Sequence, residues 1–246
     1  MLISAMVGID SRVTMDIDTT LRNYPLNCES AEQIVWQIAD VEIDDKISFV
    51  IKKTEEIMED SEYQGVRLSL DAYLDKTRIP LKIDISTGDV ITPCEISFSY
   101  QLMFENRTIP LLAYPPETVL AEKLETILSR GEANTRLRDF YDVYILQRED
   151  FVVTPDALCH ALLATCRKRG HEDLLHTYTS ILDRVRQSGT MRTQWMKYQS
   201  DFDYAAGITW DTVLDTVETL CMKTLDDHAF GDELPQEESQ FEMHLL

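Results

Sequence analysis

Two aspartates separated by a single residue, Asp16 and Asp18, lie near the start of the chain. In a β-strand successive side chains point to opposite faces, so both carboxylates project from one face while Met15 and Ile17 point into the core. Two close carboxylates repel each other unless a cation lies between them. Mg²⁺ binds through one or two protein carboxylates together with substrate phosphates. The pair therefore predicts a divalent metal site.

A third aspartate, Asp84, lies in a second predicted strand, residues 81–85. The three apolar residues of this strand share one face, and Lys82 and Asp84 share the other. A third carboxylate would complete a two-metal cluster that clamps the attacking and leaving oxygens in phosphoryl or nucleotidyl transfer. The D-x-D pattern is short and common. A capped turn with a solvated aspartate, and a solvated strand face at Asp84, therefore stay open as alternatives.

Three blocks together resemble one known family. They are Gly8-Ile9-Asp10-Ser11-Arg12-x-Thr14-x-Asp16-x-Asp18, then Leu120-Ala121-Glu122-Lys123-Leu124, then Arg136-x-Arg138-Asp139-Phe140-Tyr141-Asp142-Val143-Tyr144. In this order, between Met1 and about Leu146, they resemble the AbiEii/AbiGii-type nucleotidyltransferases. These are the toxin half of type IV toxin-antitoxin and abortive-infection systems.

The resemblance implies a polymerase-β-like nucleotidyltransferase core whose catalytic and Mg²⁺-binding residues are Asp16, Asp18 and Asp84. It implies an NTP as donor, an RNA acceptor with a tRNA 3′ end as the expected one, and growth inhibition as the outcome. It also implies a cognate antitoxin encoded nearby, which need not form a stable complex.

The resemblance to the family also implies further residues as substrate contacts. Arg12, Thr14 and Arg138 belong to the matching blocks, and Lys123 matches the family's lysine near the triphosphate. Either Asp139 or Asp142 matches the later family aspartate, and the choice stays open. Lys123 snorkelling along an apolar helix face is the alternative for that residue. An exposed Arg138–Asp142 pair is the alternative for the last block.

The family's first motif opens with Gly-Gly or Gly-Ser on a strand-to-helix turn, roughly ten residues before the aspartates, where backbone N–H groups can cradle phosphate. This sequence opens with residues 1–6, which read as the helix after that turn. We therefore expect the first strand and glycine turn to be missing, through a misassigned start or a truncated chain. A noncatalytic remnant that binds a nucleotide or a partner is the alternative function. A metal-dependent phosphohydrolase, with water as acceptor, is a third.

Composition narrows the class of protein. The 246 residues carry a formal net charge of −21, which disfavours broad adhesion to nucleic acid. A local cluster of Arg130, Arg136 and Arg138 is either a path for an RNA end or a solvated helix face. Five dispersed cysteines predict reduced thiols and a cytoplasmic protein. No apolar run approaches the roughly 20 residues of a membrane span.

The periodicity predicts an α+β fold in which a mixed sheet with flanking helices is followed by a helical part. We expect helices at 1–7 and from Asn27 or Ser30 to 40. Strands are expected after them, at 46–52, 66–71, 81–85, 95–99 and 108–112. Later helices are expected at 116–130, 135–147, 155–168, 171–187, 190–198 and 210–225. We expect a nucleotidyltransferase sheet domain over 1–114, a helical domain over 115–230 and a flexible acidic tail over 231–246.

Overall fold

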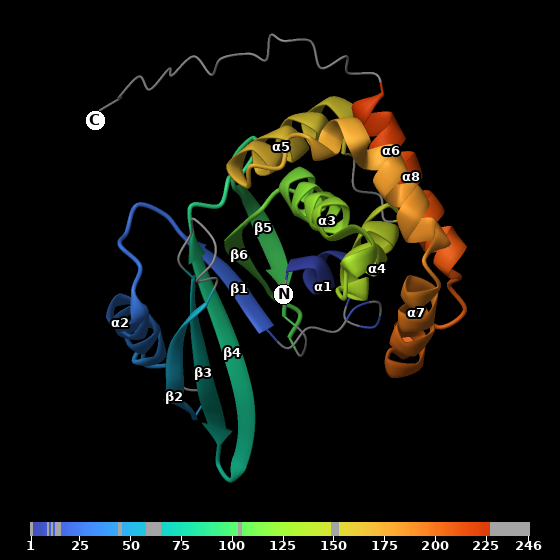
Figure 1. The fold of residues 1–246 in the computed structure, drawn as a ribbon. Helices are drawn as coiled ribbons and strands as arrows, with labels where there is room; N and C mark the ends of the chain where they lie inside the picture. The colour runs from blue at the N-terminus through green and yellow to red at the C-terminus, as the bar shows by residue number, and fades with distance from the viewer. Residues whose placement is uncertain are drawn as a thin grey trace.

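The computed structural model has a sheet-bearing part followed by a part built of helices (Figure 1). It describes residues 2–8, 10, 12, 16–43, 46–57, 65–102, 105–148 and 153–226. The predicted acidic tail, 231–246, and Thr14 lie outside the described residues. The mixed α/β architecture with a helical C-terminal part confirms the predicted fold class.

The main sheet has four strands in the order β1-β4-β3-β2. Strand β1 runs parallel to β4, whereas β4 with β3 and β3 with β2 are antiparallel. The sheet is therefore mixed, as predicted. The strands and the helices beside them are α1 (Leu2–Val7), β1 (Asp16–Leu21), α2 (Cys28–Ala39), β2 (Ile47–Ile57), β3 (Gly65–Leu74) and β4 (Thr77–Thr87).

Helix α2 covers one face of this sheet. Its N-cap is Asn27, whose side chain accepts a hydrogen bond from the backbone of Ser30 at 2.8 Å. The Ser30 hydroxyl accepts one in return from the Asn27 N–H, so both residues proposed as caps form one capping box. Apolar residues of α2 and of alternate strand positions form a small core: Leu26, Ala31, Val35, Val66, Leu68, Leu70 and Ile85. The intervening strand residues consequently lie on the other, polar face.

A two-stranded antiparallel sheet connects the two parts of the chain. Strand β5 (Ile96–Gln101) pairs only with β6 (Thr108–Ala113) in the described residues. Pro110 lies opposite Ser99 in this hairpin. Because both strands are at an edge, the missing N–H of Pro110 costs no central ladder bond, as the sequence predicted.

The helical part begins with α3, after β6. Its helices are α3 (Pro116–Arg130), α4 (Leu137–Leu146), α5 (Pro155–Lys168), α6 (Leu174–Gln187), α7 (Gly189–Asp201) and α8 (Trp210–Leu225). Helix α3 ends at Gly131, whose φ of +50° suits glycine. Helix α4 begins at Leu137 and not at 135, because the Asn134 side chain accepts a hydrogen bond from the Arg136 N–H at 2.7 Å.

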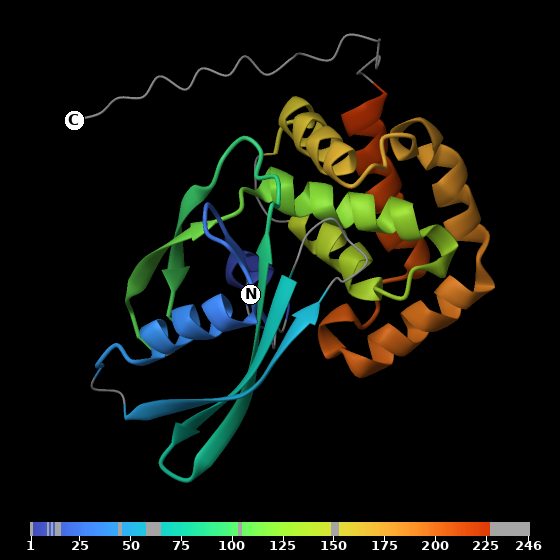
Figure 2. The ribbon, with the colours of Figure 1, turned by 60° about the vertical axis from the view of Figure 1, so that its left-hand side comes forward.

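A large core joins these helices, and it includes Ile3 and Val7 of α1. The N-terminal helix is therefore packed with the helical part, on the other side of the sheet from α2 (Figures 1 and 2). The division at residue 114 stays a prediction. No helix in the described ranges is both long and apolar enough to cross a membrane.

Candidate active site

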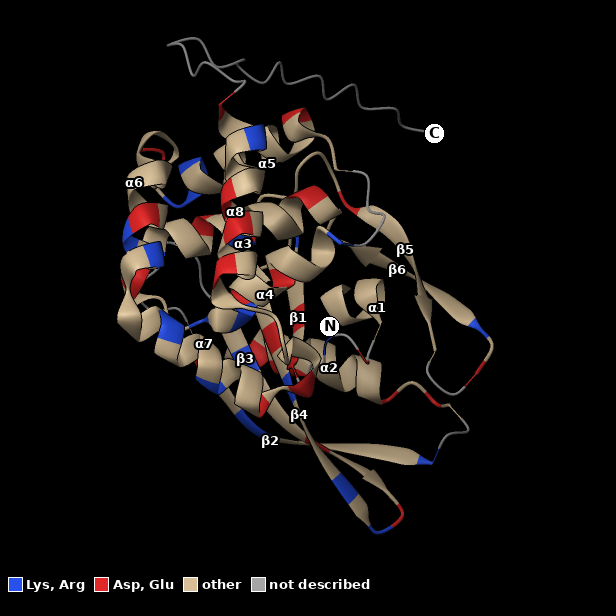
Figure 3. Cartoon of the chain, turned by 90° about the vertical axis from the view of Figure 1, so that its right-hand side faces the viewer, with Lys and Arg blue, Asp and Glu red and all other residues tan. Residues whose placement is uncertain are grey.

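The polar face of the main sheet carries a row of charged side chains across its four strands. The strand register places Asp18 opposite Asp84, Asp84 opposite Arg67, and Arg67 opposite Glu55. Asp16 lies two residues before Asp18 on the same face, opposite Lys82. The three predicted catalytic aspartates therefore share one face of adjacent strands. Figure 3 shows acidic and basic positions along β1, β3 and β4.

Arg67 is the cation that pairs with Asp84 in this row. Its guanidinium donates two hydrogen bonds to the Asp84 carboxylate, from Nε to Oδ1 at 2.7 Å and from Nη2 to Oδ2 at 2.6 Å. The hydrogen bonds to Asp84, with the negative charges of Asp84, Asp16 and Glu55, raise the pKa of Arg67 further above its ordinary value. Arg67 thus stays charged and holds Asp84 in a bidentate pair.

The row has the donor chemistry of a Mg²⁺ site, since carboxylate oxygens are the ligands that this ion prefers. Within the described ranges, however, no three His, Cys, Asp or Glu side chains converge as a ready ligand set. Both oxygens of Asp84 are engaged by Arg67. Asp16, Asp18 and Asp84 could hold the ion if Asp84 used the lone pairs that Arg67 leaves on its oxygens or released one oxygen. The Mg²⁺ site stays a prediction.

A second charged cluster lies in the helical part. The Nζ of Lys123, on α3, donates to Oδ1 of Asp139 at 2.6 Å and lies 3.3 Å from Oδ2 of Asp142, both on α4. Arg12 donates to the same Asp142 carboxylate, from Nε at 3.1 Å and from Nη2 at 3.2 Å. Four residues predicted from separate motifs are therefore brought into direct contact.

Burial sets the electrostatics of this cluster. Arg12, Asp139 and Asp142 are buried, and Lys123 is half-buried. Burial alone would lower the pKa of Lys123, but Asp142 and Asp139 more than offset it and the pKa is raised. The two carboxylates differ in one respect. Both oxygens of Asp142 have cationic partners, whereas Oδ2 of Asp139 is buried without a hydrogen-bond partner among the described residues.

The motifs that carry these two clusters fall within one family match. A family model described as nucleotidyl transferase AbiEii toxin, type IV TA system, matches residues 1–216. The chain belongs to this family. The comparisons found no curated protein and no solved structure that matches it. Membership in the AbiEii family implies a nucleotidyl transferase toxin and a cognate antitoxin, and it confirms the resemblance seen in the sequence.

Polar contacts connect the AbiEii carboxylate row to the helix that carries Lys123. Thr20 and Ser86, on the same face as the row, each donate to Oδ2 of Asp89, at 2.6 and 2.5 Å. Tyr114, just before α3, donates to the same oxygen at 2.9 Å. The polar face of the sheet therefore meets the start of the helical part at Asp89.

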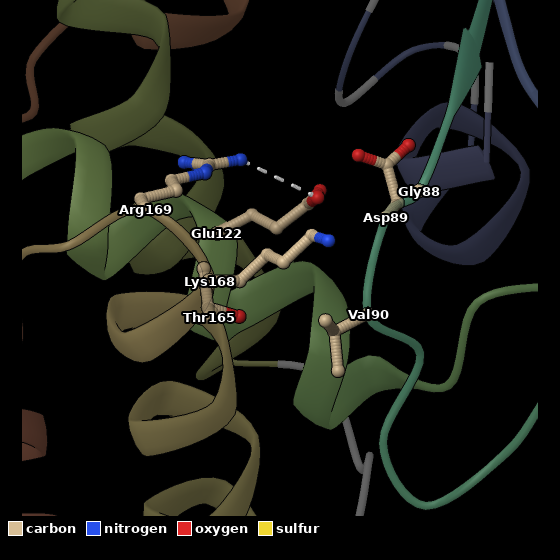
Figure 4. A pocket seen from close by; sticks show the side chains of 7 residues that line it. All are labelled: Gly88, Asp89, Val90, Glu122, Thr165, Lys168 and Arg169. Atoms are coloured by element: carbon tan, nitrogen blue, oxygen red, sulfur yellow. Dashed lines mark ion pairs between the residues drawn. The ribbon is translucent and has the colours of Figure 1, made fainter. Parts of the chain in front are cut away.

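A small cavity lies at this junction (Figure 4). Its lining residues are Gly88, Asp89, Val90, Glu122, Thr165, Lys168 and Arg169. Glu122 points toward Asp89, and its carboxylate lies 3.6 Å from Arg169. Burial and the charge of Asp89 raise the pKa of Glu122 to about 7. The volume of ≈ 30 Å³ suits one or two waters, far below the several hundred Å³ of a nucleotide pocket.

Arg138 has a different partner from the one considered in the sequence. Its guanidinium carbon lies 5.7 Å from the centre of the Phe202 ring. Asp142 is fully buried and pairs with Arg12 and Lys123, so the alternative of an exposed Arg138–Asp142 pair is wrong. Packing of α4 on its neighbours turns Asp142 inward, which an i, i+4 spacing alone does not show.

Sequence reasoning missed Arg67 and Asp89 as parts of this charged region. Arg67 lies on the polar face of its strand, and the alternation of polar and apolar residues in the sequence already indicated this. Its pairing with Asp84 depended on the β3–β4 register, which the spacing did not give. Asp89 follows β4 in a loop and had no periodic signal at all.

Proposed function

We propose that this AbiEii-family protein transfers a nucleotide from an NTP to an RNA acceptor, with a tRNA 3′ end as the expected acceptor. The reaction joins the α-phosphorus of the NTP to an acceptor hydroxyl oxygen and releases pyrophosphate. Mg²⁺, held by Asp16, Asp18 and Asp84, would supply charge neutralisation at the attacking and leaving oxygens.

One observation carries the proposal. Three carboxylates share a sheet face. Through Thr20, Ser86 and Asp89 the same face contacts Tyr114, just before α3, the helix that carries Lys123. The negative row and the cationic cluster thus lie on parts of the molecule that touch. A metal ion requires an acidic site and a triphosphate requires a cationic one, so this arrangement supports both sites.

We propose distinct roles for the residues of the second cluster. Asp142 holds Arg12 and Lys123 in place, because both of its oxygens contact these two cations. Asp139 is the family aspartate that acts in the site, since its Oδ2 has no hydrogen-bond partner in the part of the chain that the structure describes. Lys123 would bind the triphosphate as a point charge, and Arg12 would add positive charge beside it.

The decisive experiment incubates the protein with Mg²⁺, each labelled NTP in turn and total tRNA. We expect label to be joined to RNA, and Asp16→Asn or Asp18→Asn to abolish the transfer while thermal unfolding stays nearly unchanged. Asp183→Asn, at an exposed position on α6, is the matched control. Retained transfer in both site variants would refute the assignment. Label released as free nucleotide would instead identify a phosphohydrolase.

The proposed cellular setting follows from the same chemistry. We propose that the protein acts in the cytoplasm, where NTP and tRNA are available, and that growth inhibition results from blocked RNA ends. The cognate antitoxin need not bind the toxin stably. Co-purification of the two chains tests that last point, since a stable complex would contradict it.

A further inference from the structure

Arg67 contacts the carboxylate of Asp84, one of the three predicted metal ligands. It is the cation placed in register between two acidic residues, Asp84 on β4 and Glu55 on β2. Asp84 in turn lies opposite Asp18. In the sheet order β1-β4-β3-β2, the facing residues are therefore Asp18, Asp84, Arg67 and Glu55. Their charges are negative, negative, positive and negative.

The contact with Asp84 is specific and uses both carboxylate oxygens, at 2.7 and 2.6 Å. A bidentate guanidinium satisfies a carboxylate in much the same way as a bound cation does. Each Asp84 oxygen keeps a second lone pair, but a divalent ion bound there would lie beside the guanidinium, and the two cations would repel each other. Arg67 and a divalent ion therefore compete for the negative charge of Asp84.

The structure also provides another place for the displaced guanidinium. The Arg67 side chain is 38% exposed, so it can move without disrupting the core. Glu55 faces it from β2, its side chain 39% exposed, and adds to the negative charge around Arg67. The Oε2 of Glu55 pairs with Nζ of Lys53 at 2.5 Å, so Arg67 would share this carboxylate with Lys53. A rotation away from Asp84 would bring Arg67 toward that second carboxylate.

We propose that Arg67 is a built-in counter-cation that holds Asp84 in the metal-free protein and yields it to a divalent ion, moving toward Glu55. This inference rests on the proposed metal site at Asp16, Asp18 and Asp84. It makes Arg67 a positioning residue that weakens metal binding when no NTP is present. A metal would then bind well only when the triphosphate adds oxygens of its own.

The test measures Mn²⁺ binding to the full chain without NTP, by electron paramagnetic resonance of free Mn²⁺. We expect Arg67→Gln to bind Mn²⁺ roughly fivefold tighter or more than wild type, because a competing charge is gone. Arg67→Lys should fall between the two, since it keeps the charge and loses the bidentate fork. Glu55→Gln should bind more weakly than wild type, because Arg67 loses its second carboxylate.

Arg78→Gln is the matched control. Arg78, on β4, pairs with Asp71 on β3 at 2.9 Å, so its loss removes an equal charge from the same pair of strands. We expect its Mn²⁺ affinity to equal that of wild type. Thermal unfolding of each variant checks that the sheet is intact.

The outcomes separate the two proposals. Equal or weaker Mn²⁺ affinity in folded Arg67→Gln, with Mn²⁺ still bound by wild type, overturns the role of Arg67 and leaves the metal site standing. Mn²⁺ binding by neither wild type nor Arg67→Gln overturns both. In an Asp84→Asn background the Arg67→Gln gain should shrink, and an undiminished gain would show that Arg67 acts by a general charge effect instead.

Discussion

Asp142 accepts hydrogen bonds from two nitrogens of Arg12, at 3.1 and 3.2 Å, although the residues are 130 positions apart in the chain. The pair attaches the segment before β1 to α4. It also fixes the position of Asp142 beside Lys123. The Arg12–Asp142 contact therefore stabilises the fold directly. It affects the site through Arg12 and Lys123, the two cations that Asp142 binds.

Asp142→Asn should therefore destabilise the fold. Removing one partner of a buried ion pair leaves uncompensated charge and costs about 3–5 kcal/mol. Denaturant unfolding followed by circular dichroism measures this loss. Asp211→Asn is the control, because Asp211 pairs with Arg192 at the surface and such a pair contributes less than about 1 kcal/mol. Equal losses in the two variants would contradict the buried role of Asp142.

Asp139→Asn should affect activity more than stability. Oδ1 of Asp139 binds Lys123, and Oδ2 has no hydrogen-bond partner within the described ranges, so the substitution removes little bonding. We expect a cost of about 1–2 kcal/mol in unfolding free energy and a loss of label transfer to RNA. A folded Asp139→Asn protein with wild-type transfer would show that Asp139 is not the family aspartate of this site.

Lys123→Met should weaken the use of NTP. A charge-assisted hydrogen bond is worth about 1.5–3 kcal/mol, which corresponds to an increase in the KM for NTP of about tenfold to a hundredfold. Steady-state transfer at varied NTP concentration measures it. Lys197→Met, at an exposed position on α7, is the control and should leave the KM unchanged. An unaltered KM in Lys123→Met would place this lysine outside the triphosphate site.

Glu122→Gln should change how stability depends on pH. The pKa of Glu122 is raised to about 7 from its ordinary 4.5, so the folded protein disfavours the ionised carboxylate. Wild-type stability should then fall as pH rises from about 4.5 to about 7. Above pH 7 we expect Glu122→Gln to be more stable by roughly 3 kcal/mol, and below pH 4.5 to match wild type.

Unfolding at pH 4 and pH 8 tests the Glu122 prediction, with Glu132→Gln, at an exposed position after α3, as control. A pH-independent difference between Glu122→Gln and wild type would mean that the carboxyl group titrates normally in the folded state.

The sequence alone determined the features that depend on local periodicity and backbone chemistry. Alternation placed Asp16 with Asp18, and Lys82 with Asp84, on single strand faces. Proline at the first turn of α3 and glycine after its last turn marked that helix to the residue. The ordered motifs identified the AbiEii family. Each of these signals lies within a few residues, where steric and hydrogen-bonding preferences act without the rest of the fold.

Only the tertiary structure decided which distant side chains meet. The β3–β4 register brought Arg67 to Asp84, and the packing of the helical part brought Arg12 and Lys123 to Asp142. The same packing gave Asp139 and Asp142 different surroundings, although they lie three residues apart. Register and helix packing minimise exposed apolar surface over the whole chain, so no single motif specifies them. The partners of each charge, and hence the chemistry available to it, were decided at that level.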